Sequence, residues 1–297
     1  MAYPDIQIES GSPEKQALIR REFEIFIELI KENLHSWFDV VIIPKDIDAA
    51  IRRICPDKEY RSKRGKIHVL AKTIKAEGKI FLVINPDIYT NRYDTHIRFH
   101  YLFHETFHFI HSRRKPSSVE WPALDQLYLK EISAYYEEYC AERFSSILCN
   151  KLLTQRSERS IEDQNIIYSG HHENVSSVAQ GLIQIRNSVE ELKNHGRGDR
   201  FLQDVKPITE SLLMSYFYLL AFRKEIPSDE NEVKYRLPDF FHRADFRDVA
   251  ALFHDRFPHP LPAGEAIRAI KKIYGHFGYT LEATDSGEFS ISVSIPC

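Results

Sequence analysis

Residues 97–111 read IRFHYLFHETFHFIH, and within this stretch His104, Glu105 and His108 form the pattern His-Glu-x-x-His. Residues four apart on an α-helix lie on one face, so both imidazoles can reach a single metal ion at about 2.0–2.1 Å. Glu105 follows the first histidine and projects beside the ion, where its carboxylate can accept a proton from water. We therefore predict a Zn2+ site with His104 and His108 as ligands and Glu105 as the general base.

The residues around this pattern favour the metal interpretation, because the pattern itself fixes only three positions. Most other side chains from Ile97 to Ile110 are apolar, which predicts a buried helix. Histidine and glutamate are costly to bury unless they are paired or bind a metal. The apolar segment 79–85, KIFLVIN, comes before the helix, and we expect this strand to bind an extended substrate. His100 and His111 share the same side of the helix, and we interpret them as bystanders.

A zinc site of this kind needs a third protein ligand and leaves one position open. Two glutamates on the next predicted helix qualify, Glu138 and Glu131. Ala, Phe and Leu follow Glu138 at three, six and ten positions. The small alanine allows this helix to approach the metal-binding helix closely, and the two large residues anchor it in the core. Glu131 has alanine at the first of these positions but a glutamate at the second. We favour Glu138, with Glu131 as the alternative ligand.

The two motifs together resemble the ImmA/IrrE-like metallopeptidases, which are zincins of the gluzincin type. That family pattern is a HExxH helix followed by a helix reading roughly E-x-x-A-x-x-F-A-x-x-L-L, and residues 138–148 read EYCAERFSSIL. The resemblance covers about residues 60–150. It implies a zincin-like fold, Zn2+ bound by His104, His108 and Glu138, and Glu105 as the catalytic base. The chain departs from the pattern at Thr106-Phe107, where the family has small residues, and it shows no helix-turn-helix partner domain.

The implied activity is hydrolysis of a peptide bond in a protein or peptide substrate by metal-activated water. Glu105 would accept the proton and pass it to the leaving amine. Tyr135 or Tyr136 could donate a hydrogen bond to the tetrahedral oxyanion. Two alternatives stay open at this point. One is a non-catalytic sensor or binding protein on the same scaffold, and the other is a toxin or defence protease that acts on one specific protein.

The predicted fold class is α+β, with a zincin-like metallopeptidase domain in residues 1–155 and a mainly helical region in residues 156–297. Apolar spacing predicts helices at 13–34, after Pro44, at 94–111 and at 124–153. A β-hairpin is predicted from 67–74 and 79–85, which flank KAEG. The polar segment 155–176 is the predicted boundary.

The second region is expected to form a helical hairpin and then a closing β-hairpin. Apolar residues from Val175 to Leu192 step by three and four, and a second apolar helix extends to about Phe222. A helix at 266–277 precedes the hairpin strands 279–283 and 288–295. We expect this region to restrict or recruit substrate rather than to supply catalytic groups. If a histidine from it assists the oxyanion, the candidates are His242, His254 and His259.

Composition and charge exclude several classes of function. The formal net charge is −3, and no segment reaches the 18–20 or so apolar residues of a membrane helix. The polar N-terminus lacks a signal-peptide core, and the four cysteines form no CxxC pair, so we expect a cytoplasmic protein with free thiols. Residues 52–79 carry ten Lys or Arg against three acidic residues. We interpret this stretch as a solvated hairpin and loop, with nucleic-acid binding as the alternative.

Overall fold

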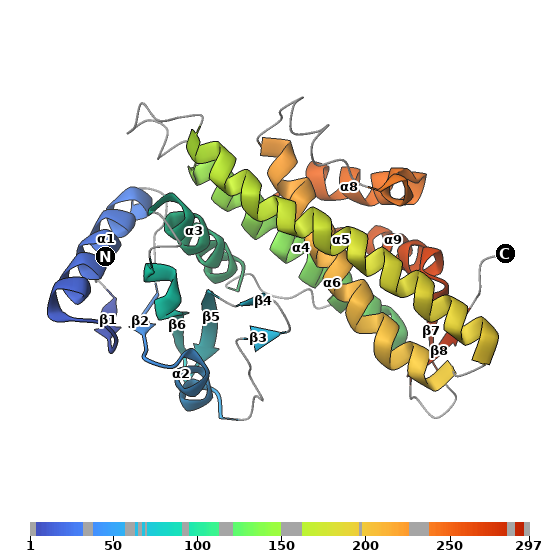
Figure 1. Ribbon diagram of the computed structural model, residues 1–297, viewed down its shortest axis with the longest axis horizontal. Helices are drawn as coiled ribbons and strands as arrows, with labels where there is room; N and C mark the ends of the chain where they lie inside the picture. The colour runs from blue at the N-terminus through green and yellow to red at the C-terminus, as the bar shows by residue number, and fades with distance from the viewer. Residues whose placement is uncertain are drawn as a thin grey trace. The chain divides into compact units, whose positions relative to one another are not determined.

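The structure is a computed structural model that describes residues 4–31, 38–56, 63–64, 67–68, 70–90, 95–112, 121–149, 162–195, 198–225, 238–283 and 289–293 (Figure 1). It is a mixed α+β protein, mostly helical, with a small four-stranded sheet. The chain divides into two units. The first unit comprises Met1–Lys115 and Phe144–Asp163, and the second comprises Pro116–Arg143 and Gln164–Cys297. Of the predicted boundary segment 155–176, residues 155–161 lie outside the described residues, and residues 162–176 belong to a long helix.

The first unit is built on a mixed sheet of order β1-β2-β6-β5. Its strands are β1 (Asp5–Ile8), β2 (Val40–Ile43), β5 (Ala71–Ala76) and β6 (Lys79–Ile84). β1, β2 and β6 are parallel, and β5 pairs antiparallel with β6. Glu77 and Gly78 connect β5 to β6 with positive φ angles, which matches the twist of a tight hairpin. The predicted hairpin is thus confirmed, with its first strand at 71–76.

Helices cover both faces of this sheet, because strand side chains alternate between faces. Helices α1 (Pro13–Lys31) and α3 (Thr95–Ser112) pack on the face formed by Val41, Leu82 and their neighbours. Helix α2 (Ile47–Ile54) packs on the opposite face, against Ile74 and Val83 (Figure 1). A short 3-10 turn, η1 (Pro86–Tyr89), follows β6. Two short strands, β3 (Lys63–Arg64) and β4 (Ile67–His68), pair antiparallel in a separate ladder.

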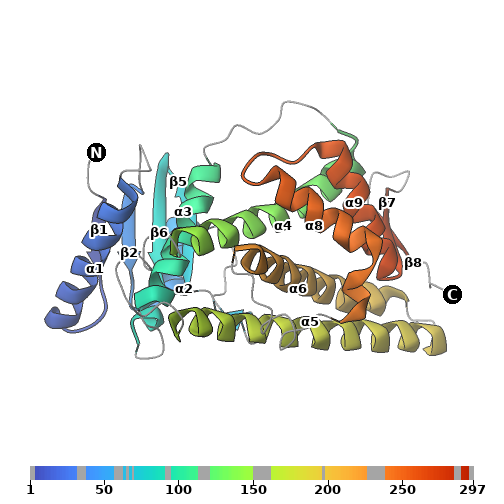
Figure 2. The ribbon, with the colours of Figure 1, turned by 90° about the horizontal axis from the view of Figure 1, so that it is seen from above.

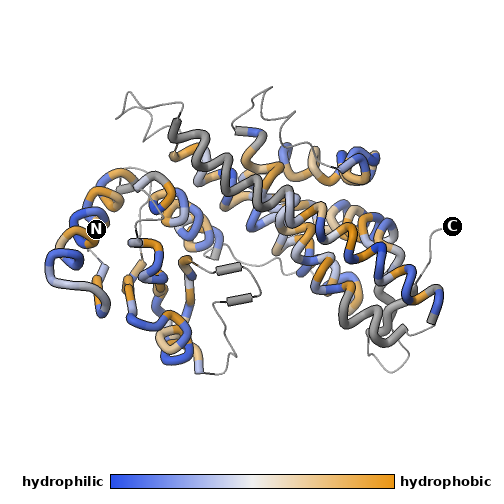
Figure 3. The backbone as a smooth tube through the Cα atoms, viewed as in Figure 1, coloured by the Kyte–Doolittle hydropathy of each residue, from blue (hydrophilic) through white to orange (hydrophobic). Residues whose placement is uncertain are grey.

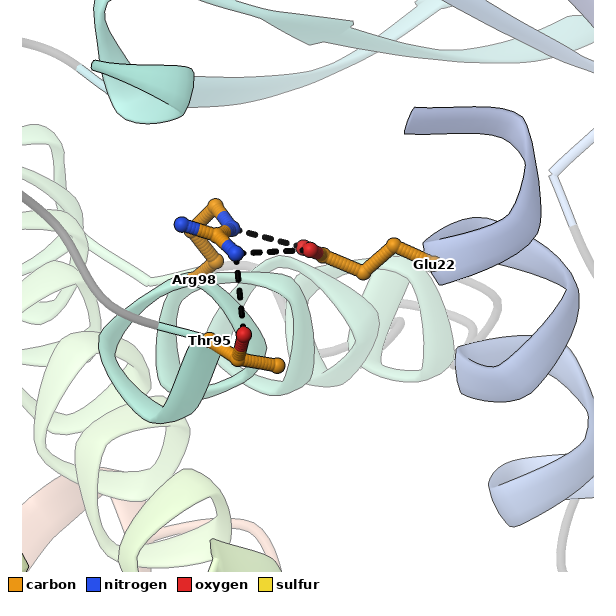
Figure 4. A network of polar contacts seen from close by, with 3 residues as sticks. All are labelled: Glu22, Thr95 and Arg98. Carbon is orange, nitrogen blue, oxygen red and sulfur yellow. Dashed lines mark hydrogen bonds and ion pairs between the residues drawn. The ribbon is translucent and has the colours of Figure 1, made fainter. Parts of the chain in front are cut away.

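A buried ion pair connects α3 to α1 (Figure 4). Arg98 Nε and Nη2 donate to the two carboxylate oxygens of Glu22, each at 2.7 Å, and Nη2 also donates to Thr95 Oγ1 at 2.9 Å. Glu22 is buried and Arg98 is mostly buried. Removal of one partner would leave an uncompensated buried charge, so replacing either residue alone would destabilise the packing of α3 on α1. It therefore helps to position the helix that carries His104 and His108.

The second unit is a helical assembly closed by a small hairpin. Its elements are α4 (Ala123–Leu148, of which the last turn belongs to the first unit), α5 (Glu162–His195), α6 (Gly198–Glu225), η3 (Asp239–His242), α8 (Ala244–Arg256), α9 (Ala263–His276), β7 (Tyr279–Ala283) and β8 (Phe289–Val293). β7 and β8 pair antiparallel, as predicted. Apolar residues alternate with polar ones along the helices whose residues are coloured (Figure 3).

The predicted helical hairpin is formed by α5 and α6, which run side by side (Figure 2). Val178, Leu182 and Ile185 of the predicted seam are buried. A Cβ added at Gly181 would lie 3.1 Å from Leu212 Cδ1, so the absence of a side chain allows α5 to approach α6 closely.

Some elements of the structure were not predicted from the sequence, and some predictions fall on residues that the structure does not describe. β1, β2 and α8 were not predicted. Within the basic stretch 52–79, residues 57–62, 65–66 and 69 lie outside the described residues. Cys55, Cys140 and Cys149 are free thiols, whereas Cys297 lies outside the described residues. Among the described helices, none combines the length and the apolar character needed to cross a membrane.

Candidate metal centre

Helix α3 brings the imidazoles of His104 and His108 together. The two residues are one helical turn apart, and their Nε2 atoms lie 3.2 Å from each other. The ring centroids are 4.9 Å apart, with the ring planes at 68°. Phe103 and Phe109, beside them in the chain, are fully buried and fix the rotation of α3, whereas the two histidines are half-buried. The helix therefore presents both Nε2 atoms at one place that solvent can reach.

The last turn of α4 packs on α3 within the first unit. Phe144 and Phe107 contact each other with ring centroids 5.7 Å apart. His100 Nε2 lies 3.2 Å from Ser145 Oγ, and the other ring nitrogen lies 3.9 Å from Cys149 Sγ. His100 therefore interacts with α4. On the same continuous helix, Glu138 precedes Phe144 by six residues, which is about 9 Å along the axis.

His104, His108 and Glu138 form a group that could hold a metal ion. One ligand atom from each residue lies within 4.8 Å of the other two, and all three side chains are half-buried. Zinc–nitrogen bonds of about 2.0–2.1 Å at a tetrahedral angle separate two ligand nitrogens by about 3.3 Å. The observed Nε2–Nε2 distance of 3.2 Å fits this value. Two imidazoles and one carboxylate also form the donor set of zinc sites that keep one position open.

The Glu105 carboxylate is outside this group and lies against strand β5. The Thr73 backbone N–H and the Thr73 hydroxyl both donate to Glu105 Oε2, each at 2.7 Å. The same hydroxyl lies 3.1 Å from the Glu105 carbonyl oxygen. Glu105 is 8% exposed, so these bonds compensate for much of the water that its carboxylate loses. The Glu105 carboxylate is thus held at a fixed place beside strand β5.

The edge strand next to α3 is β5, and this corrects the prediction for segment 79–85. That segment forms β6, which is paired on one side with β2 and on the other with β5. A strand with both sides paired cannot bind an additional extended chain. Segment 79–85 was predicted as the substrate-binding strand because its apolar run is longer than that of β5. Buried central strands have such runs, whereas the edge strand β5 carries exposed Lys72 and Lys75.

Glu131, the alternative ligand, interacts with other groups of the second unit. Its Oε2 accepts a hydrogen bond from the Tyr274 hydroxyl, and Lys206 Nζ lies 3.1 Å from Oε1. Glu131 is not a member of the group formed by the two histidines. The Tyr274 contact and the Lys206 ion pair give this half-buried carboxylate a structural role.

The tyrosines predicted as oxyanion donors are buried in the second unit. The Tyr136 hydroxyl donates to the carbonyl oxygen of His259 at 2.7 Å. The ring of Tyr135 packs on Phe217 with centroids 5.8 Å apart, and burial raises the pKa of its phenol. Tyr139 is fully buried and its hydroxyl contacts His254 Nδ1.

Tyr218 on α6 is the polar neighbour of Glu138 that the sequence did not reveal. Its hydroxyl donates to Glu138 Oε2 at 2.5 Å. No sequence signal marks this residue, because it is one tyrosine in an apolar helix and stands 80 positions from its partner. The second region therefore supplies a polar group next to a candidate ligand, which the prediction of a purely restricting or recruiting role did not include.

Among the three candidate histidines of the second region, His254 has the most distinctive environment. His242 is exposed, and the backbone carbonyl of His259 accepts a hydrogen bond from the Tyr136 hydroxyl. Burial, together with the positive charges of Lys224 and Arg143, lowers the pKa of His254 from 6.5 to about 4. His254 is therefore neutral in the folded protein at neutral pH.

This neutral histidine predicts an acid-dependent loss of stability. Between pH 6.5 and about 4 the unfolded chain binds a proton at His254 that the folded chain does not, so the free energy of unfolding falls as the pH falls through this window. Because the side chain is only half-buried, we expect the loss to be about 1–2 kcal/mol. Urea unfolding of metal-free protein at pH 7.5 and pH 4.5 measures it. The difference between the two pH values should shrink in His254→Gln, and an identical difference would contradict the assignment.

No protein-family model, no curated protein and no solved structure matches this chain.

Proposed function

We propose that this protein is a zincin-like, zinc-dependent peptidase in which His104, His108 and Glu138 hold the metal. The observation that supports this most directly is the 3.2 Å separation of the two histidine Nε2 atoms, with a carboxylate oxygen of Glu138 in the same group. Two neighbouring imidazoles with both Nε2 atoms at one point suit a shared cation. The three ligands leave a coordination position for water or substrate, as hydrolytic zinc sites require.

The chain's own residues account for the proton transfers of the reaction. A zinc ion, when bound, would polarise the scissile carbonyl and acidify a water molecule. Glu105 is next to His104 but outside the ligand group, so its carboxylate can accept the proton of the attacking water and pass it to the leaving amine. The Thr73 hydrogen bonds hold this carboxylate in position.

The edge of strand β5 supports a peptide as the substrate. β5 pairs only with β6 in the described sheet, and its Thr73 touches the Glu105 carboxylate. An extended peptide can add to a sheet edge through backbone hydrogen bonds. A peptide on this edge would lie beside the proposed base, which is the placement that hydrolysis of its backbone needs. The resemblance of residues 104–108 and 138–148 to ImmA/IrrE-like metallopeptidases supports the same reaction class.

The first test of this proposal is the metal content of the protein. We expect one zinc per chain in protein purified without chelator, because the two histidines and the glutamate already form a three-ligand group. Elemental analysis by mass spectrometry measures the stoichiometry, and a chelator followed by added zinc tests reloading. Protein that holds well under half an equivalent and takes up none would refute the metal site.

Peptidase activity is tested separately from metal content. Zinc-loaded protein is incubated with a mixed peptide library, and new termini are identified by mass spectrometry, with chelated protein as the control. Zinc-dependent cleavage supports the peptidase. Stoichiometric zinc without cleavage of the library or of unfolded proteins would favour the sensor or binding protein on the same scaffold.

A further inference from the structure

Tyr218 on α6 and Glu138 on α4 form a direct contact between two helices of the second unit. The Tyr218 hydroxyl donates to Glu138 Oε2 at 2.5 Å, and both side chains are half-buried. A phenol has one proton to donate, and here it points at the carboxylate. Hydrogen bonds to a charged acceptor are short and strong, so this distance is that of a charge-assisted bond.

Neighbouring contacts fix the two helices at this point. Phe217, adjacent to Tyr218, is fully buried and packs on Tyr135, which is three residues before Glu138 on α4. Phe217 also contacts Phe253 of α8, with ring centroids 4.6 Å apart. Because consecutive residues of α6 contact positions 135 and 138 of α4, the Tyr218 hydroxyl has a defined place relative to the carboxylate.

We infer that Tyr218 is a positioning residue that orients the Glu138 carboxylate for metal binding. This inference rests on the proposed zinc site. Ligand side chains in metal sites are oriented by outer hydrogen-bond partners, which reduce the freedom that the ligand loses when the metal binds. A hydrogen-bond donor on Oε2 restricts rotation of the carboxylate and so fixes its orientation. Tyr218 thus acts through Glu138, and a side chain of α6 contributes to how tightly the site binds zinc.

The test measures zinc affinity of the full chain by competition with a chromophoric chelator. Tyr218→Phe removes the hydroxyl and keeps the ring, and we expect about 10–100-fold weaker zinc binding. The metal-free variant should keep the circular dichroism spectrum of the wild type, which shows that it folds. Tyr216→Phe removes a hydroxyl two positions away on the same helix, on a residue stacked against Phe241, and should keep wild-type zinc affinity.

A double-variant experiment separates a positioning role from a general structural one. In a Glu138→Ala background, Tyr218→Phe should cause no further loss of zinc affinity, because the hydroxyl acts only through the carboxylate. An equal loss in both backgrounds would overturn the inference, as would a Tyr218→Phe affinity within about threefold of the wild type. Wild-type protein that binds no zinc would refute both the inference and the proposed function. Wild-type protein that binds zinc as tightly as Tyr218→Phe would refute the inference alone.

Discussion

Replacement of Glu105 by glutamine is expected to lower zinc-dependent peptide hydrolysis by about 10²–10⁴-fold while zinc stays bound. The amide is almost the same size as the carboxylate but cannot accept the proton of the attacking water at neutral pH. Its oxygen can still accept the hydrogen bonds that Thr73 donates, so we expect the variant to fold. Elemental analysis and a cleavage assay on the same preparation measure both parts of the prediction.

The control for this variant is Glu24→Gln. Glu24 is an exposed residue of α1, so the substitution makes the same change of charge far from the histidines in the chain and should leave both zinc content and hydrolysis unchanged. If Glu105→Gln lost zinc, Glu105 would be a ligand and the roles assigned to Glu105 and Glu138 would be wrong. Unchanged hydrolysis in a zinc-loaded Glu105→Gln preparation would instead show that another group is the base.

Replacement of a proposed ligand by alanine, in His108→Ala or Glu138→Ala, should leave the purified protein with well under one zinc per chain and should reduce the stabilisation that added zinc confers. Zinc at a free concentration of 100 times the wild-type dissociation constant raises the free energy of unfolding by about 2.7 kcal/mol. A variant that binds about 100-fold more weakly gains only about 0.4 kcal/mol at that concentration. Urea unfolding with and without zinc measures the difference for each protein.

His111→Ala is the matched control on the same helix. His111 stacks on Phe107 with ring centroids 5.9 Å apart and is outside the ligand group. We expect this variant to retain the zinc-dependent stabilisation even if its metal-free stability is lower. Full zinc stabilisation in Glu138→Ala together with its loss in Glu131→Ala would identify the alternative ligand instead. Loss of zinc in His111→Ala would show that the ligand set is larger than three residues.

The features that the sequence predicted well depend on local periodicity. His104 and His108 share a face because an α-helix repeats every 3.6 residues, and α3 holds their Nε2 atoms 3.2 Å apart. The choice of Glu138 over Glu131 used the small and large residues that follow it, and in the structure Ala141 is fully buried and Phe144 contacts Phe107. The hairpins and the long helices were predicted for the same reason, since their patterns are complete within one segment.

The parallel strands β1 and β2 could not be predicted from local pattern. Each has four residues, and their partners in the sheet come from distant segments. A buried parallel strand reads as a short apolar run, which has no periodicity to distinguish it from part of a helix. Helix α8 was missed for a different reason, because charged residues interrupt its apolar positions.

The amino-acid sequence by itself determined the HExxH face of α3, because that pattern lies within one helix, whereas it left the third ligand between Glu138 and Glu131. Only the tertiary structure decided which groups surround them. Thr73 reaches Glu105 across 32 positions, and Tyr218 reaches Glu138 across 80. The pairing of β6 on both sides likewise made β5 the edge strand beside the proposed base. Such contacts depend on how separate elements pack, and no periodicity within a single segment encodes them.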